Sequence, residues 1–288
     1  MSNIQIPKIV EVMHTIQGEG IRSCRPVTFI RFFGCTLPGC PGFGQKDPCD
    51  KSTWKTPELR IDKAPEFGCD SPKSWYEPFK KFCKSYDSVD ALYEDTIAKQ
   101  PETCQKEIVI TGGEPMLWQD FIIQFIQKCF LNGTKHFTIE TNGMIAPKKE
   151  LIDFIEDTPI DMLFSISPKL NCVAGVDESK SIQIPVLKQY LEDMKTHSNI
   201  ECQFKFVVNE DERALNKIFE IRDRILEGRN GDYAYFKELL TEHILLMPVG
   251  AWSHSQELKQ KTVQICIDNG FIYCPRIHVD VWGSKVGV

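Results

Sequence analysis

The chain has 288 residues, of which 42% are hydrophobic and 26% charged, and its formal net charge is −6 at pH 7. This composition is typical of a globular protein that is large enough to bury a core without disulfide bonds. The net negative charge argues against non-specific electrostatic binding to nucleic acid or to an anionic membrane. We therefore expect no nucleic acid and no membrane among its partners.

The first segment, residues 1–12, alternates polar and apolar side chains and lacks the basic and apolar regions of a signal peptide. No apolar run approaches the roughly 20 residues that span a bilayer. We therefore predict that this segment forms a strand and that the protein is cytoplasmic. Twelve cysteines then indicate core thiols or metal ligands rather than disulfides. Three of them lie in apolar runs typical of a core: Cys129, Cys202 and Cys266.

Short apolar, β-branched runs alternate along the chain with segments of helical spacing. This alternation predicts parallel strand pairing and an α/β fold, as a barrel or as an open sheet. In both architectures chemistry gathers at the carboxyl ends of the strands. The predicted strands are 27–33, 107–113, 136–141, 162–167, 203–208, 243–249 and 271–277, and the predicted helices are 118–131, 147–156, 183–196, 211–227 and 254–269.

Two segments interrupt this alternation. Residues 41–85 are rich in Pro, Gly, Lys and Asp and are predicted to form a long, partly irregular insertion. Residues 228–242 are predicted to form a shorter insertion with one or two helical turns. Because the sequence shows no internal repeat, low-complexity tract or linker, we expect a single domain over 1–288.

Cysteines gather after the first strand of the alternating pattern. Cys35 and Cys40 lie on a loop that contains Gly and Pro, and Cys49 and Cys69 follow. Thiolates at this spacing can converge on one metal centre, and three of them suffice for an iron–sulfur cluster with one open iron. The same spacing also suits a zinc site or unrelated thiols.

Polar turns follow the next three strands, and the first two of these turns contain glycine. Paired glycines let a ligand approach the backbone, and a carboxylate can accept hydrogen bonds from an amine. Each turn alone could serve only to reverse the chain, but their combination at one edge of a sheet indicates a binding site. The three are Thr111-Gly112-Gly113-Glu114-Pro115, Glu140-Thr141-Asn142-Gly143 and Ser167-Pro168-Lys169.

Two further motifs lie near the ends of the chain. The stretch TIQGEG, residues 15–20, is a loop that can present backbone groups and an amide to a flat polar ring. The other stretch, residues 276–283, contains His278. A lone histidine near a strand end is usually structural.

Together these motifs resemble the radical S-adenosylmethionine (SAM) enzymes, and among them the 7-carboxy-7-deazaguanine synthase family of queuosine and 7-deazapurine biosynthesis. The resemblance runs through TIQGEG, FIRFFGC, TGGEP, ETNG, SPK and the RIHVDVWGSKVGV ending. It implies a partial, open β/α barrel with an insertion in the cluster-binding region. The cysteine spacing departs from the C-x3-C-x2-C of most radical SAM enzymes, because the first pair here is C-x4-C.

The resemblance also implies the cofactors and the residues that bind them. A 4Fe–4S cluster would be held by Cys35, Cys40 and Cys69, with Cys49 as the alternative third ligand. The family pattern places Asp and then Thr or Ser after the third cysteine, and Ser71 matches the Mg²⁺ position. SAM would be bound by Gly112, Gly113, Glu114, Glu140, Ser167, Pro168 and Lys169.

The implied reaction converts 6-carboxy-5,6,7,8-tetrahydropterin to 7-carboxy-7-deazaguanine with loss of ammonia, through a 5′-deoxyadenosyl radical from SAM. No side chain is expected to act as the catalyst itself. The fork of Arg31 suits a substrate carboxylate, although an arginine within a strand also serves structural ion pairs. The residues implied to bind the substrate are Ile16, Gln17, Gly18, Arg31, Thr111 and His278.

The family further implies a homodimer and a flavodoxin or ferredoxin as the reductant. Two other functions remain open from the sequence. One is a radical SAM activase that abstracts hydrogen from a glycine of a partner protein. The other is a zinc-stabilised binding module that uses Cys35, Cys40, Cys49 and Cys69.

Overall fold

The computed structural model describes residues 4–37, 69, 71–229, 231–249 and 256–283. Eight strands form one sheet whose spatial order follows the sequence. The first pair is antiparallel and every later pair is parallel. The strands are β1 (Ile9–Ile16), β2 (Pro26–Phe32), β3 (Glu107–Gly112), β4 (His136–Thr141), β5 (Asp161–Ile166), β6 (Ile200–Val208), β7 (Ile244–Pro248) and β8 (Ile272–Tyr273).

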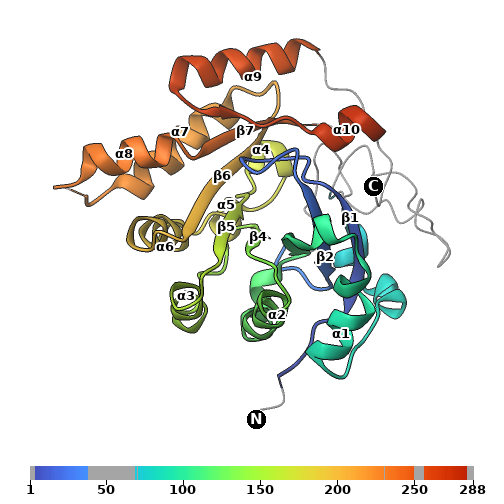
Figure 1. Ribbon diagram of the computed structural model, residues 1–288. Helices are drawn as coiled ribbons and strands as arrows, with labels where there is room; N and C mark the ends of the chain where they lie inside the picture. Colours follow the sequence, from blue (N-terminus) through green and yellow to red (C-terminus); the bar gives the residue numbers. More distant parts are fainter. Residues whose placement is uncertain (1–3, 38–68, 70, 230, 250–255, 284–288) are drawn as a thin grey trace.

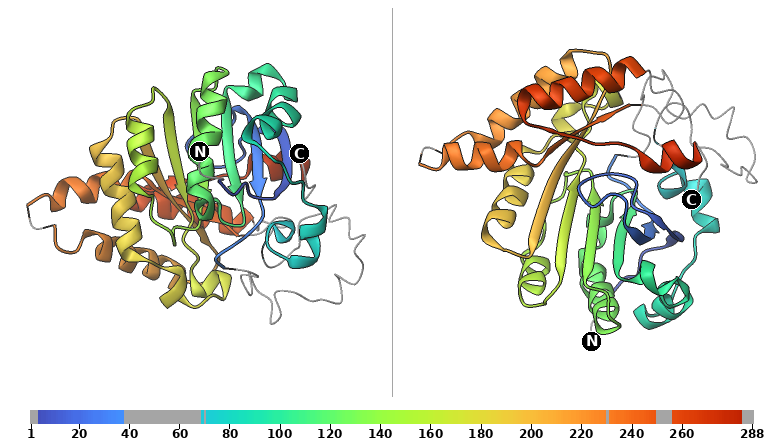
Figure 2. Two further views of the ribbon diagram at one scale, coloured as in Figure 1. Left: turned by 90° about the horizontal axis from the view of Figure 1, so that it is seen from below. Right: turned by 45° about the horizontal axis from the view of Figure 1, so that its top comes forward.

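The sheet is curved but not closed, because no pairing joins β8 to β1 within the described ranges. The longer helices lie along its outer face (Figure 1). The loop between β1 and β2 lies on the opposite, concave side (Figure 2). The helices are α1 (Val89–Asp95), α2 (Gln119–Leu131), α3 (Lys149–Glu156), α4 (Asn171–Ala174), α5 (Glu178–Ser181), α6 (Ile184–Thr196), α7 (Arg213–Leu226), α8 (Tyr233–Thr241), α9 (Gln256–Asn269) and α10 (Ile277–Trp282).

Short 3₁₀ helices fill several connections. They are η1 (Pro72–Ser74), η2 (Glu77–Phe82), η3 (Ile97–Lys99), η4 (Glu102–Gln105) and η5 (Pro115–Trp118). No helix in the described part of the chain is long and apolar enough to cross a membrane.

The main core lies between the sheet and the helices. In α2, buried residues recur at helical spacing on one face, and the Phe121 ring meets Phe32 of β2 edge-on at 5.5 Å. In β6, side chains alternate between the faces: Phe204 and Phe206 join the main core, while Gln203 and Lys205 do not. The strand thus places polar groups on the concave side. Cys129, Cys202 and Cys266 are buried in the core, as predicted.

The predicted α/β fold, a partial, open β/α barrel, is confirmed, and most elements lie within a few residues of their predicted ranges. The prediction for 271–277 is wrong in extent: only Ile272 and Tyr273 are paired, and α10 begins at Ile277. Pro275 offers no N–H for a strand ladder, which explains the early end. The strand predicted within 1–12 begins at Ile9 and continues to Ile16.

The two predicted insertions have different outcomes. Most of the range 41–85 lies outside the described residues, and its described end contains η1 and η2. The range 228–242 contains α8, as the expectation of helical turns there suggested. The short α1, which Ser88 caps by accepting a hydrogen bond from Ala91 N, was not predicted.

Candidate functional site at the carboxyl ends of the strands

The turn after β3 packs directly on the turn after β2. Glu114 N donates to Gly34 O at 2.7 Å. A Cβ added to Gly113 would overlap Gly34 O and come within 2.8 Å of Cys35 Cβ. Only glycine allows this approach, so the TGGEP turn and the first predicted cluster ligand are fixed against each other.

Glu114 joins this turn to the one after β4. Its side chain is fully buried, and its carboxylate accepts hydrogen bonds from Met116 N, Thr141 Oγ1 and Asn142 N at 2.8–3.0 Å. Burial raises the pKa of Glu114 above its ordinary value, although the three hydrogen bonds act in the other direction. In this structure the carboxylate holds the two turns together, and its role toward a ligand amine stays a prediction.

The cysteine loop is tied to the same edge. Asn142 Nδ2 donates to Thr36 Oγ1 at 2.8 Å, and Leu37 N donates to Cys35 Sγ at 3.3 Å. Leu37 and Cys69 both pack against the same small apolar cluster, Ala174 with Val176. The fold therefore brings Cys35 and Cys69 to one region.

Other predicted ligands fall outside the described residues, namely Cys40 and the alternative, Cys49. Within the ranges that are described, no group of three or more His, Cys, Asp and Glu residues is arranged to hold a metal ion. The predicted Mg²⁺ residue, Ser71, accepts a hydrogen bond from Arg31 Nη1 at 3.1 Å.

The turn after β5 completes this edge of the sheet. Ser167 N donates to Thr141 O at 2.8 Å, and Lys169 Nζ donates to Ser167 Oγ at 3.0 Å. Pro168 between them is buried. Between the two preceding strands, Thr111 Oγ1 of β3 donates to Glu140 Oε2 of β4 at 2.8 Å. All the predicted SAM-binding residues thus lie at the ends of three consecutive strands.

Arg31 lies on β2 with only 16% of its side chain exposed. Its Nε donates to Glu11 Oε1 of β1 at 2.8 Å. The structure therefore shows the ion pair that was the structural alternative, together with the contact to Ser71. Both interactions fix the guanidinium at the carboxyl end of β2.

The TIQGEG loop meets the C-terminal segment of the described chain. Ile277 N donates to Gly18 O at 3.0 Å, and a Cβ on Gly18 would overlap the ring of His278. Gln17 is buried, and its Oε1 accepts from Glu19 N at 3.3 Å. Gly18 and His278, predicted separately from opposite ends of the sequence, are in contact.

Four residues around this contact between the TIQGEG loop and the C-terminal segment were not predicted as site residues. The Glu19 carboxylate lies 2.5 Å from Lys205 Nζ, 3.5 Å from Arg276 Nε and 4.0 Å from His278 Nε2. Gln203 Oε1 accepts from Ile21 N at 2.9 Å. A sequence signal existed for Lys205, since a lysine inside the apolar run QFKFVV requires a partner when buried.

The charges around Glu19 determine its protonation. Burial alone would raise the pKa of Glu19, but the positive charges of Lys205, Arg276 and His278 outweigh it and lower the pKa to about 2. Burial would lower the pKa of Lys205, but the carboxylates of Glu19 and Glu140 raise it above its ordinary value. Glu19 and Lys205 therefore form a charged pair at neutral pH.

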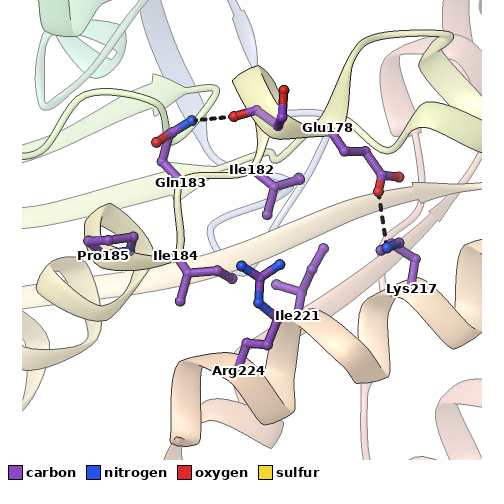
Figure 3. Close-up of a pocket in the computed structure, with 9 residues that line it drawn as sticks. Glu178, Ile182, Gln183, Ile184, Pro185, Lys217, Ile221 and Arg224 are labelled. Carbon is purple, nitrogen blue, oxygen red and sulfur yellow. Dashed lines mark hydrogen bonds and ion pairs between the residues drawn. The ribbon is translucent and has the colours of Figure 1, made fainter.

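A separate pocket lies between the start of α6 and α7 (Figure 3), with a volume of about 420 Å³. Ile184, Pro185 and Ile221 provide apolar walls, and Lys217 in its lining pairs with Glu178 at 3.1 Å. None of the predicted site residues lines it. We do not assign this pocket to the candidate site.

The barrel is open and mostly parallel, a cysteine loop follows its first parallel strand, and glycine-containing or polar turns follow the next three strands. This combination defines a class of proteins, the radical SAM enzymes. Comparison with known proteins narrows the assignment. The 7-carboxy-7-deazaguanine synthase of Buchnera aphidicola subsp. Schizaphis graminum is 30% identical over 222 residues, which cover 72% of this chain and 87% of the relative. That of Halobacterium salinarum is 27% identical, covering 96% of this chain and 90% of the relative.

The chain therefore belongs to the 7-carboxy-7-deazaguanine synthase family. The crystal structure of QueE from Escherichia coli has the same fold, with a TM-score of 0.56, 20% identity and coverage of 94% of both chains. No family model matches the chain.

Proposed function

We propose that this protein is a 7-carboxy-7-deazaguanine synthase, which converts 6-carboxy-5,6,7,8-tetrahydropterin to 7-carboxy-7-deazaguanine with loss of ammonia. The observation that carries the proposal is the convergence of two sets of motifs. The cysteine loop packs on the TGGEP turn at the strand ends, and the TIQGEG loop contacts His278 on the concave side. The family relationship supports the same reaction.

The residues present fit a 4Fe–4S cluster next to β2. The absence of a side chain on Gly113 makes room for Cys35, and the amide of Leu37 donates to Cys35 Sγ. An N–H donor stabilises a thiolate, and such bonds also tune cluster potentials. We assign Cys35, Cys40 and Cys69 as the ligands. When bound, the cluster supplies the electron for reductive cleavage of SAM, which starts hydrogen abstraction from the substrate.

We assign the SAM site to the three turns at the strand ends. Glu114, through its three hydrogen bonds, keeps the backbone of Gly112 and Gly113 in place beside the cysteine loop. Lys169 adds a positive charge beside Ser167, which suits the carboxylate of an amino acid. Glu140 has the acceptor oxygens that a ribose requires, and Pro168 stiffens the last turn.

The substrate would lie on the concave side of the sheet. Arg31 is fixed by Glu11 and contacts Ser71, which supports placing the substrate carboxylate beside Mg²⁺ at Ser71. Oxygen ligands of this kind suit Mg²⁺. Thr111 supplies a hydroxyl at the end of β3. Gly18 lies against His278, and we assign Ile16, Gln17, Gly18 and His278 to contacts with the pterin ring.

The remaining expectations also belong to this proposal. A flavodoxin or ferredoxin would supply the electron, the enzyme would act in the cytoplasm as a homodimer, and its product would enter queuosine or 7-deazapurine biosynthesis. An electron-carrier partner follows from the chemistry, since each turnover begins with a one-electron reduction.

The test is a reconstitution of the full chain under anaerobic conditions. Iron and sulfide would be added, followed by SAM, dithionite, Mg²⁺ and the carboxytetrahydropterin, and mass spectrometry would follow 7-carboxy-7-deazaguanine. We expect product formation, with loss of at least about a hundredfold in rate on Cys69→Ala because a cluster needs its ligands. Cys49→Ala is the matched control and should retain activity.

Two results would contradict parts of the proposal. Formation of 5′-deoxyadenosine without the deazaguanine would exclude this substrate, as expected for an activase of a partner protein. A zinc-loaded, colourless protein with no iron–sulfur absorption after reconstitution would exclude the radical mechanism and favour a zinc-stabilised module.

A further inference from the structure

The loop between β1 and β2 is held mainly by parts of the chain that are distant in sequence. Gly20 N donates to Cys274 Sγ at 3.2 Å, and Ile21 N donates to Gln203 Oε1 at 2.9 Å. Gly18 O accepts from Ile277 N. The loop therefore connects the first strands to β6 and to the segment after β8, across the concave side of the open barrel (Figure 2).

Lys205 makes a further connection to this loop, a buried ion pair with Glu19. Its side chain is only 8% exposed, and Nζ lies 2.5 Å from Glu19 Oε2. The other carboxylate oxygen of Glu19 faces Arg276 Nε at 3.5 Å and His278 Nε2 at 4.0 Å. One carboxylate on the loop thus joins a cation of β6 to two basic residues of the segment after β8.

The geometry of this cluster determines what Lys205 can do. Its ammonium donates to Glu19, so Lys205 can act on a ligand through the loop that carries Glu19. A buried ion pair adds little net stability, because desolvation offsets the attraction, but it fixes the arrangement of the groups that it joins. Here those groups belong to the wall formed by Gly18 and His278.

We propose that Lys205 is a positioning residue, which holds Glu19 and thereby keeps the TIQGEG loop and the His278 segment in one arrangement around the substrate. The kinetic part of this inference depends on the proposed function, because it uses the pterin as the substrate. The structural part concerns only the loop and stands separately.

The structural part is tested by hydrogen–deuterium exchange on the full-length chain, both as purified and after reconstitution. In Lys205→Met, we expect amide protection in residues 16–21 to fall by at least about tenfold, because the loop opens locally more often. Lys149→Met is the matched control, since Lys149 is 82% exposed and pairs with Asp153 on its own helix. Unchanged protection of 16–21 in Lys205→Met would overturn the proposal.

The kinetic part is tested by steady-state rates and SAM binding. In Lys205→Met we expect KM for the pterin to rise roughly 10- to 100-fold, because a displaced loop removes binding that the ground state and the transition state share. The rate constant kcat and the dissociation constant of SAM should change by less than about threefold. Lys205→Arg keeps the cation and should restore most of the affinity for the pterin.

The double variant Lys205→Met with Glu19→Gln separates positioning from general stability. Removing both charges eliminates the unpaired buried carboxylate, so the midpoint of thermal unfolding should return toward the wild-type value. The KM should stay raised, because nothing holds the loop. If the double variant regains both stability and KM, the pair is only structural and the proposal fails.

A failure of the proposed function gives a different pattern from a failure of this inference. If the wild-type protein binds iron and SAM but makes no deazaguanine, the reaction assignment is wrong. The exchange experiment then still decides whether Lys205 orders the loop.

Discussion

Glu114 and Glu19 are two acidic residues of the site whose surroundings shift their pKa values in opposite directions. Burial dominates at Glu114 and raises its pKa, although three neutral hydrogen-bond donors and the charge of Lys169 act in the other direction. At Glu19 the charges of Lys205, Arg276 and His278 outweigh burial and lower the pKa to about 2. Glu19 is therefore the carboxylate whose ionised form stabilises the folded state.

This difference predicts an acid-dependent contribution from Glu19. A pKa that is lower in the folded state gives stability above the ordinary value of 4.5 that is lost as pH falls toward 2. We expect Glu19→Gln to lower the free energy of unfolding at pH 7 by roughly 1–3 kcal/mol. The difference from wild type should shrink steadily below about pH 4.

Urea denaturation between pH 3 and pH 7 would measure this contribution. Glu210→Gln, at an exposed glutamate, is the matched control and should leave the free energy of unfolding within about 0.5 kcal/mol of the wild-type value. A constant deficit for Glu19→Gln across the whole range would contradict the assigned pKa shift.

At the scale of the elements, the site depends on how closely the connecting turns approach each other. The turn after β3 lies against the turn after β2 at Gly113, and Glu114 joins it to the turn after β4. Ser167 N continues the series by donating to Thr141 O. Successive parallel strands thus carry successive turns that are hydrogen-bonded in order.

Gly113→Ala tests this packing. The new Cβ would overlap Gly34 O, and because backbone cannot move aside like a side chain, we expect a loss of roughly 1–3 kcal/mol of stability. Displacement of Cys35 should also lower iron incorporation. Thermal unfolding and the absorbance of the reconstituted protein near 400 nm would measure the two effects.

Gly231→Ala is the matched control, because a Cβ at that position meets nothing within 4 Å. It should leave both the unfolding midpoint and iron content unchanged. Normal stability and iron content in Gly113→Ala would show that the turn has room that the structure does not indicate.

At the scale of the whole molecule, one large apolar cluster extends from Ile9 at the start of β1 to Cys274 after β8. It includes Phe125 of α2 and Phe206 of β6, which belong to opposite halves of the sequence. This cluster therefore runs through the whole described sheet, and a second, much smaller cluster of Val27, Phe29 and Val109 lies on β2 and β3. This continuity supports the expectation of a single domain.

We therefore predict one cooperative unfolding transition. Far-ultraviolet circular dichroism and tryptophan fluorescence should give coincident midpoints in urea. Phe125→Ala and Phe206→Ala should each lower both midpoints together, with losses of about 3–5 kcal/mol. Two separate transitions, or a shift of only one probe, would show that the chain contains more than one folding unit.

Local patterns in the sequence were enough to predict most strands of the parallel sheet and most of its helices. Strands such as β4 and helices such as α2 were predictable because their apolar spacing and turn residues agree with their final environment. The strand predicted through Ile277 failed because Pro275 and the lack of a partner beyond β8 ended it early. Pairing at a sheet edge depends on neighbours that the local sequence does not specify.

The sequence by itself determined which residue types gather at the strand ends, since each strand is followed by its own Gly-rich or polar turn. Cys35, Gly113, Glu140 and Ser167 were identified in this way. Only the tertiary structure decided that the Glu114 carboxylate is used internally and that Lys205 of β6 pairs with Glu19. The physical reason is that a buried charge is stabilised by partners close in space, which the curved sheet brings together from distant parts of the chain.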